Sequence, residues 1–438
     1  MKILKNSVWI LLSSVLLVHA CTQPQNQIET TAFLPIQLKE GYGPFHPGFS
    51  FVRNSTKDSP VWCKTYLSVN GIPKSWSRTS VSYVILNNNQ FVYQNFIVGN
   101  INLTDYQGLQ KDWHLFPDTN RVSKKPIRCY IYVIRGFDEK SGKWVVKVDT
   151  NNNLDFSDEA TIHPKTIDPK DPYQYDKPLR IQYEIYQKGV VQPAELPMVV
   201  KMYGSELLYN FPQYATTTLK KGNKEYQLTL ASGFTTPDFE KTRLVDPSSL
   251  FFSGKIEDKD LIEIDDVVAI GGSKYRNKGV DVFNNWLELE PADGKKQPYS
   301  LQVGNSFQPF AGRDFLTGRT VDLGNYRGKY VYIDFWGTGC KGCVQDMPAL
   351  VNIYRKVDTD KVAFIGITLD SPKRLKTFMV KSPLRWPQVI SNDTNQLFER
   401  YHVTGLPTSV LISPNGTIIA RNIRPDELRD ALSSQLIN

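Results

Sequence analysis

Cysteine and histidine are scarce in this sequence, which holds five of each among 438 residues. Only Cys340 and Cys343 stand close together, and no second cysteine pair or histidine pair has the spacing of a zinc site. Four zinc ligands cannot be assembled locally from so few candidates. The Cys-x-x-Cys pair is therefore expected to be a redox pair that undergoes thiol and disulfide chemistry, rather than half of a zinc site.

Clusters of basic residues and long apolar runs are also missing. The formal net charge is +8, but Lys and Arg are spread along the chain, which gives no support to nucleic-acid binding. A general affinity for anionic membrane surfaces is compatible with this charge. The apolar run at residues 8–18 is interrupted by Ser13-Ser14 and followed by a polar stretch, so it is too short for a transmembrane helix.

The N-terminus instead has the parts of an export signal. A basic start at residues 1–5 precedes the apolar run 8–18, and Val18-His19-Ala20-Cys21 is a small-residue cleavage site that ends in cysteine. This pattern resembles a bacterial lipoprotein signal. His19 stands where that pattern has a small or aliphatic residue, so plain secretion is the alternative.

The lipoprotein resemblance implies how the mature chain is attached. Residues 1–20 would be removed, Cys21 would carry the lipid, and residues 21–37 would form a flexible tether. The resemblance predicts a protein of the bacterial cell envelope that is lipid-anchored to the membrane and faces the periplasm.

The Cys340-x-x-Cys343 pair lies where a strand pattern changes to a helix pattern. The apolar segment 330–335 precedes it, and apolar side chains recur on one helical face over residues 344–357. Cys340 is therefore expected at a helix N-terminus, where unpaired amides and partial positive charge favour the thiolate. Lys341 adds a nearby cation. Cys340 is the predicted nucleophile, and Cys343 is predicted to resolve the mixed disulfide.

Three further motifs accompany this pair in a fixed order: Phe335-Trp336, Met347-Pro348 and Gly405-Leu406-Pro407-Thr408. Together with the pair, they make residues 303–438 resemble the thioredoxin superfamily, and within it the TlpA/ResA-like thiol-disulfide oxidoreductases of bacterial envelopes. The resemblance implies an α/β thioredoxin-like domain, with a central mixed sheet flanked by helices.

The same resemblance implies a substrate site. It consists of Trp336, Leu406 and Pro407, with a cis peptide bond before Pro407 and the backbone of Leu406 free to pair with an extended substrate segment. A trans proline in an ordinary turn is the alternative.

Two carboxylates flank the cysteine pair. Asp334 lies six residues before Cys340, as the buried aspartate of thioredoxin does, and Asp346 lies three after Cys343, where ResA-like proteins often carry a glutamate. The resemblance implies that either could be the base that activates Cys343. A solvated helix residue is the alternative for Asp346.

Two glycines depart from the family pattern. Gly339 replaces the usual tryptophan before the first cysteine, and Gly342 replaces the usual proline inside the pair. The intervening dipeptide tunes the relative stability of dithiol and disulfide, so the redox potential and the direction of electron flow stay open.

The function implied is a lipid-anchored periplasmic thiol-disulfide oxidoreductase that reduces protein disulfides. It would be recharged by a membrane dithiol donor and would need no cofactor beyond its redox-active disulfide. An envelope binding protein with a mainly structural thioredoxin-like domain is the alternative. A peroxidase is disfavoured, because peroxiredoxins place a threonine three residues before the reactive cysteine and Thr338 lies two before Cys340.

The region before residue 300 follows a different pattern. Residues 38–298 are β-rich, with short strand patterns at 144–148, 180–185 and 197–202 and few stretches of helical periodicity. Turn clusters such as 87–89 and 221–223 separate the strand patterns, and a boundary is expected at 291–298. One or two sandwich-like domains are predicted.

Two cysteines of this region remain after Cys21 and the redox pair are accounted for. Cys63 and Cys129 could form a structural disulfide in an oxidising compartment. The alternative is two separate buried thiols, since both lie beside aromatic residues in strand-like segments.

One polar loop of this region has the spacing of a calcium site. Oxygen side chains alternate at Asp149, Asn151, Asn153 and Asp155, as in a calcium loop of the EF-hand or dockerin kind. Leu154 stands where the tight turn requires glycine, and Ala160 where the bidentate carboxylate belongs. A polar hairpin turn with local Asx hydrogen bonds is the alternative.

Overall fold

The computed structural model describes residues 30–52, 61–113, 118–168, 171, 174–239, 241–245, 256, 260–292, 299–403 and 405–436. The signal segment 1–20 and Cys21 lie outside these residues, as does most of the expected boundary at 291–298. Residues from Thr31 onward form one compact unit.

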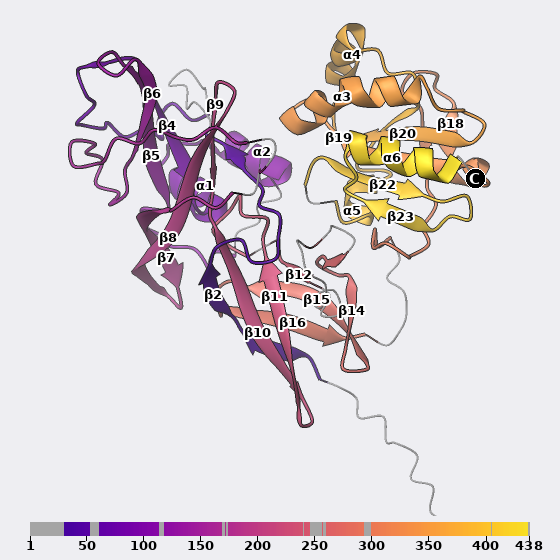
Figure 1. Cartoon of the computed structure of the whole chain (residues 1–438), viewed down its shortest axis with the longest axis horizontal. Coiled ribbons are helices and arrows are strands. Elements are labelled where there is room, and N and C mark those ends of the chain that lie inside the picture. The colour runs from indigo at the N-terminus through magenta and orange to yellow at the C-terminus, as the bar shows by residue number, and fades with distance from the viewer. Residues whose placement is uncertain are drawn as a thin grey trace, which may run out of the picture. The chain divides into compact units, whose positions relative to one another are not determined.

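The C-terminal part of the chain is built on one mixed sheet (Figure 1). Strand β19 (Tyr330–Trp336) is central, with β20 (Val362–Thr368) and then β21 (Gln388–Ile390) parallel on one side. On its other side lie antiparallel β22 (Thr408–Ile412) and β23 (Ile418–Arg421). This mixed sheet confirms the expected thioredoxin-like fold.

Helices cover both faces of that sheet. Residues of α3 (Lys341–Tyr354), α4 (Pro372–Lys381) and α6 (Pro425–Leu436) share one core with Tyr332 and Trp336. The short α5 (Leu397–Arg400) packs on the opposite face with Ile333 and Phe335. Successive strand residues alternate between faces, so Asp334 lies on the α3 side together with Tyr332 and Trp336. The small hairpin of β17 (Ala311–Arg313) and β18 (Thr320–Asp322) leads into the domain, with the 3-10 turn η3 (Leu323–Tyr326) after it.

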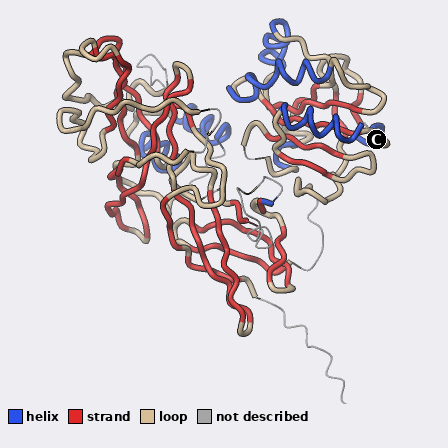
Figure 2. The backbone as a smooth tube through the Cα atoms, in the orientation of Figure 1, coloured by secondary structure: helices blue, strands red, loops and turns tan. Residues whose placement is uncertain are grey.

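The region before the thioredoxin-like domain is rich in strands (Figure 2). Its first pair of sheets shares a single core. One sheet holds β1 (Ala32–Pro35), β16 (Trp286–Pro291), β15 (Ser273–Asp281) and β14 (Val267–Ile270). The other holds β13 (Leu261–Ile262), β12 (Arg243–Val245), β11 (Lys224–Ala231), β10 (Gln213–Lys221) and β2 (Gln37–Glu40). Leu230 and Leu244 of one sheet pack with Leu287 of the other, a sandwich-like arrangement.

The strands β1 and β2 correct the expected tether. They are separated only by Ile36, which is buried in the shared core, and they belong to different sheets. The chain from Ala32 onward is therefore part of the fold, and a flexible tether reaching residue 37 is wrong at its C-terminal end.

A second pair of sheets also shares a single core. One sheet holds β4 (Trp76–Ile85), β5 (Tyr130–Asp138) and β6 (Lys143–Val148). The other holds β3 (Ser50–Phe51), β9 (Glu206–Asn210), β8 (Val190–Tyr203) and β7 (Leu179–Gln187). Val133 and Val146 of the first sheet share a core with Ile181 and Leu196 of the second. The prediction of a β-rich region is confirmed.

Two helices of this region were not expected: α1 (Asn88–Ile97) and α2 (Leu103–Trp113). The asparagine cluster at 87–89, expected as a turn, is instead the start of α1, where the Asn87 side chain accepts a hydrogen bond from the backbone of Gln90 at 2.9 Å. The buried face of α1 includes Gln90 and Gln94, whose amides bond to backbone groups of Ser123 and Ile127. Polar residues on the inner face hide the apolar period that identifies a helix.

The predicted Cys63–Cys129 bridge is wrong. The structure holds the two residues as separate thiols, with Cys129 buried and Cys63 exposed. Cys129 packs with Phe91 and Ile101, and burial raises the pKa of its thiol well above the usual range. The alternative of buried thiols therefore holds for Cys129 alone.

The polar loop after β6 is held by its own backbone. The buried carboxylate of Asp149 accepts from the amides of Asn153 at 2.9 Å and Leu154 at 3.0 Å. The side chains of Asn151 and Asn153 donate to Asp158, and Asp155 accepts from the Ser157 amide. Across the described ranges, no three His, Cys, Asp or Glu side chains are grouped to hold a metal ion. Local Asx bonding accounts for the loop, and calcium stays a prediction.

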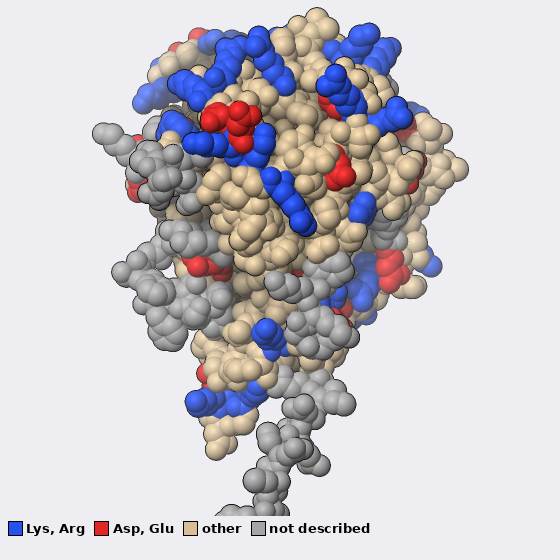
Figure 3. Space-filling view, turned by 90° about the vertical axis from the view of Figure 1, so that its right-hand side faces the viewer, with Lys and Arg blue, Asp and Glu red and all other residues tan. Residues whose placement is uncertain are grey.

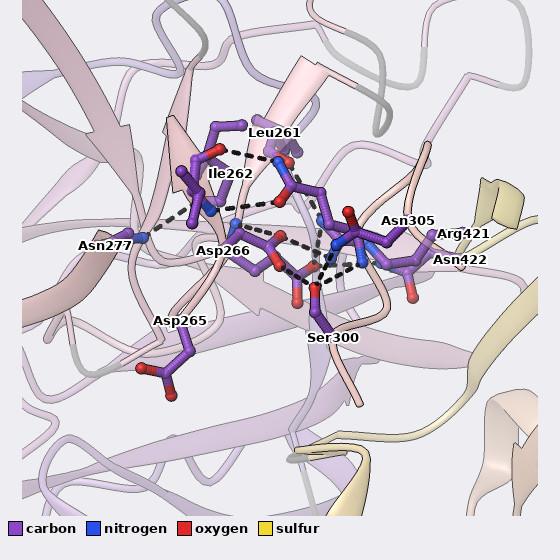
Figure 4. A network of polar contacts seen from close by, with 12 residues as sticks. Leu261, Ile262, Asp265, Asp266, Asn277, Ser300, Asn305, Arg421 and Asn422 are labelled. Carbon is purple, nitrogen blue, oxygen red and sulfur yellow. Dashed lines mark hydrogen bonds and ion pairs between the residues drawn. The ribbon is translucent and has the colours of Figure 1, made fainter. Parts of the chain in front are cut away.

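A buried polar network joins the loop before β14 to strand β23 (Figure 4). Arg421 and Asp266 form an ion pair at 2.9 Å, with each side chain 5% exposed. Arg421 also donates to the carbonyl of Leu261, and Asp266 accepts from Ser300. The β-rich region is thus fastened to the edge of the thioredoxin-like sheet by a desolvated pair.

Candidate active site

The cysteine pair stands at the beginning of α3, as expected. Cys340 is the N-cap of the helix, with extended backbone at φ −87° and ψ 107°, and is joined to Cys343 by a disulfide. The backbone N–H of Cys343 donates to the Cys340 sulfur at 3.1 Å. That contact and the helix N-terminus would stabilise a thiolate at Cys340 once the disulfide is reduced.

The two sulfurs differ in access. Cys343 is only 2% exposed, whereas Cys340 is half-buried. A substrate sulfur can approach Cys340 more readily, which supports the assignment of Cys340 as nucleophile and Cys343 as the resolving thiol.

Asp370 fixes the loop that leads to Cys340. Its carboxylate accepts from the Thr338 amide at 2.6 Å and from the Thr338 hydroxyl at 2.7 Å. Arg374, one turn along in α4, approaches the same carboxylate at 3.5 Å. Sequence reasoning missed this role, although parallel pairing of Trp336 with Thr368 places Asp370 beside Thr338.

The loop before β22 lies directly against the cysteine pair. The Leu406–Pro407 peptide bond is cis, as expected. A Cβ built on Gly342 would stand 3.5 Å from Cδ of Pro407, and one built on Gly337 would stand 3.5 Å from Cδ1 of Leu406. Gly342 therefore lies beside Pro407 with room for a Cβ in ordinary van der Waals contact, and Leu406 is 37% exposed.

Trp336 does not belong to a substrate surface, which corrects its expected role. Its side chain is fully buried, and the indole N–H donates to Oε1 of Gln388 at 2.9 Å. The ring packs at 5.2 Å from that of Phe378. Trp336 stands on the α3 side of β19, so it supports the site from within the core.

Asp334 and Asp346 face the same side of the sheet. Asp334 is 4% exposed, and burial raises its pKa to about 7, with the Asp346 charge adding to the shift and Arg424 opposing it. Asp346 bonds to Arg424 at 2.7 Å, and burial also raises its pKa. Asp346 is therefore an ion-paired residue rather than a solvated one. At neutral pH, Asp334 can both accept and release a proton.

Comparison with known proteins places the C-terminal third in a family. The model of the AhpC/TSA family matches residues 303–421. The thiol-disulfide oxidoreductase ResA of Bacillus thuringiensis subsp. konkukian is 30% identical over 137 residues, covering 31% of this chain and 78% of ResA. ResA of Geobacillus kaustophilus is 33% identical over 141 residues, covering 32% of this chain and 75% of that protein. The chain belongs to the ResA family.

Two solved structures are similar to the same third of this ResA-family chain. The thioredoxin domain of a thiol-disulfide oxidoreductase from Bacteroides vulgatus is 29% identical, with a TM-score of 0.29, covering 31% of this chain and 98% of that one. A thiol:disulfide interchange protein DsbE from Chlorobium tepidum is 27% identical, with a TM-score of 0.28, covering 31% of this chain and 96% of that one.

The ResA-like domain makes this protein a thiol-disulfide oxidoreductase. Its redox centre opens on a cleft of about 1180 Å³. Cys343, Asp334, Asp346, Leu406 and Pro407 line it. The two carboxylates, Cys343 and the proline loop therefore line the same cleft.

The face drawn in Figure 3 carries charge of both signs. Lys and Arg side chains gather mostly over the upper part of this face, with Asp and Glu side chains among them. Within the described residues, none of the helices has both the length and the apolar character to cross a membrane.

Proposed function

We propose that this chain reduces disulfides of protein substrates in the periplasm. The observation that carries the proposal is the disulfide at the N-cap of α3, with accessible Cys340, buried Cys343 and the cis-Pro407 loop against them. The ResA relatives, named thiol-disulfide oxidoreductases, support substrates that carry disulfides.

The chemistry begins with both cysteines reduced. The Cys340 thiolate attacks one sulfur of the substrate disulfide, forming a mixed disulfide and releasing the other substrate sulfur as a thiolate, which takes up a proton. Cys343 gives its proton to a base and attacks the Cys340 sulfur, which releases the second substrate thiol. The substrate gains two electrons, and the Cys340–Cys343 disulfide is restored to the dithiol by a membrane dithiol donor.

Asp334 is the proposed base for Cys343. It lines the same cleft as Cys343, and its pKa near 7 suits proton transfer at neutral pH. Asp346, the second carboxylate, contributes indirectly, because its negative charge raises the pKa of Asp334.

A mixed-disulfide trap tests the reaction. Cys343→Ser should accumulate partners linked to Cys340, because the resolving thiol is gone, while the matched Cys340→Ser variant should accumulate none. Absence of linked partners in Cys343→Ser would instead favour an envelope binding protein with a mainly structural thioredoxin-like domain.

The direction of electron flow is tested by the redox potential. Equilibration of the pair with glutathione should give a value well below about −200 mV for a reductase, whereas a value near about −120 mV would mark an oxidant.

The proposed location rests on the N-terminal segment. Cys21 would carry the lipid that anchors the protein to the membrane. Cys21→Ala should release the protein from the membrane fraction, and wild-type protein that fractionates as soluble would contradict the anchor.

A further inference from the structure

The β-rich region contacts the cysteine run at one place and approaches the proline loop at another. Nζ of Lys341, inside the Cys-x-x-Cys run, lies 3.9 Å from the centre of the Phe51 ring and 3.5 Å from the Glu206 carboxylate. At the proline loop, Nζ of Lys241 lies 3.9 Å from where a Cβ on Gly405 would stand. Residues from β3, β9 and the segment before β12 therefore flank both the cysteine run and the loop that binds substrate.

The cleft between these contacts is lined by residues of the thioredoxin-like domain on one side and of the β-rich region on the other. The thioredoxin-like wall includes Cys343, Leu406 and Pro407. The opposite wall comes from the β-rich region and includes Thr235, Thr236, Lys241, Ile264 and Asp265. Its volume of about 1180 Å³ exceeds the 300–1,000 Å³ that is usual for small ligands, and suits a polypeptide segment.

The second wall is fixed to the redox residues by one short segment. Arg421 pairs with buried Asp266, and the side-chain amide of Asn422 donates to the Glu263 carboxylate at 3.3 Å. Three residues after Arg421, Arg424 bonds to Asp346 at 2.7 Å. The loop that carries one wall and the carboxylate of the redox site are thus tied to the same four residues.

We propose that the β-rich region is part of the substrate-docking surface, with Lys241 beside a disulfide-bearing polypeptide segment that lies along Leu406 and Pro407. This rests on the proposed function. The occupant is inferred from the continuity of the cleft with Cys343 and from the exposure of Leu406 beside it. A small disulfide needs only the sulfur of Cys340, so the second wall favours polypeptide disulfides over small ones.

Photocross-linking tests the position of the substrate. A benzoylphenylalanine residue is placed at position 241 of full-length Cys343→Ser protein, and insulin is trapped on Cys340 as the polypeptide probe. Irradiation should link insulin to position 241 but not to the matched position 224, an exposed lysine at the start of β11.

The outcomes separate the two proposals. A trapped complex without a cross-link at position 241 overturns the docking surface and leaves the proposed function standing. Failure to trap insulin at all overturns both. Cross-links from position 241 to a second copy of the chain, or to the chain's own residues before 32, would identify another occupant of the cleft and also overturn the inference.

Kinetics give a second readout. Lys241→Glu should raise KM for insulin three- to tenfold and leave reduction of glutathione disulfide unchanged, while the control Lys224→Glu should change neither. Equal effects of Lys241→Glu on both substrates, or no effect on either, would contradict a docking role.

Discussion

The guanidinium of Arg424 bonds to the carboxylate of Asp346 at 2.7 Å, on the face of the sheet where Asp334 is buried. Arg424 precedes α6, whereas Asp346 lies in α3 one turn after Cys343. One cation from the end of the chain therefore influences both carboxylates of the redox site, lowering the pKa that burial raises in each.

Removal of that cation should shift the pH dependence of the reaction. Arg424→Gln is expected to raise the pKa of Asp334 above its value of about 7, because the charged carboxylate loses an attractive partner. Resolution of the mixed disulfide by Cys343, followed by stopped-flow against pH, should move its acid limb to higher pH. The control Arg429→Gln, on the exposed side of α6, should leave the profile in place. An unchanged profile in Arg424→Gln would remove Asp334 from the proton-transfer step.

Asp334 should also make stability depend on pH. Its folded-state pKa of about 7 lies above the ordinary value of about 4, so the folded protein binds more protons than the unfolded chain between those two values. Stability should fall as pH rises through this window and level off above it. Asp334→Asn removes the cost of the buried charge and should stabilise the protein above pH 7 by at most about 4 kcal/mol.

Urea denaturation at pH 5 and pH 8 measures this effect. The gain of Asp334→Asn over wild type should be larger at pH 8, and Asp393→Asn, an exposed carboxylate, should show no such difference. A gain that is equal at both pH values would mean that Asp334 does not titrate in this window.

The thioredoxin-like domain could be predicted because its signals are local. Apolar runs mark β19 and β20, and the cysteine pair and Pro407 stand in a recognisable order. The helix α1 could not, because Gln90 and Gln94 occupy its inner face and are satisfied by backbone groups more than thirty residues away.

Long-range partners explain the other differences. Arg424 bonds to Asp346, which is 78 positions away in the sequence, and Asp370 bonds to Thr338, which is 32 positions away. No local sequence pattern reveals such partners. The predicted place of Trp336 on a substrate surface is wrong, because its position in the motif does not show which way its side chain points. In β19, side chains alternate between the two faces, and that of Trp336 points into the core. Cysteine counting likewise cannot show whether Cys63 and Cys129 come within bonding distance.

The buried amide of Gln388 should matter for stability. Gln388→Leu leaves the indole N–H of Trp336 without its acceptor, which should lower the free energy of unfolding by about 1–3 kcal/mol. Gln227→Leu, an exposed glutamine on β11, is the matched control and should change it by less than about 0.5 kcal/mol. Urea denaturation measures the free energy of unfolding of both variants. Equal losses would mean that the hydrogen bond between the Trp336 indole and Gln388 does not contribute to stability.

Asp370 should hold the loop before Cys340 in place. Asp370→Ala removes the acceptor of both Thr338 bonds and should destabilise the protein by about 2–3 kcal/mol, whereas Thr338→Val removes only the hydroxyl bond and should cost about 0.5–1.5 kcal/mol. Hydrogen exchange of the Thr338 amide should accelerate in Asp370→Ala but not in Thr338→Val. Protection that survives the loss of Asp370 would show that another contact fixes the loop.

The buried ion pair between Arg421 and Asp266 should behave as a coupled unit. Asp266→Asn leaves the buried guanidinium with only the more distant Glu263 carboxylate, at 3.7 Å, and Arg421→Met leaves the buried Asp266 carboxylate without a counter-charge, so each should cost about 3–5 kcal/mol. The double variant should cost less than the sum of the two, because neither charge is then left alone in the contact between β23 and the β-rich region. Urea denaturation of all four proteins gives the coupling energy. Additive losses would show that the two side chains stabilise the structure independently and do not fasten the β-rich region to the redox domain as a pair.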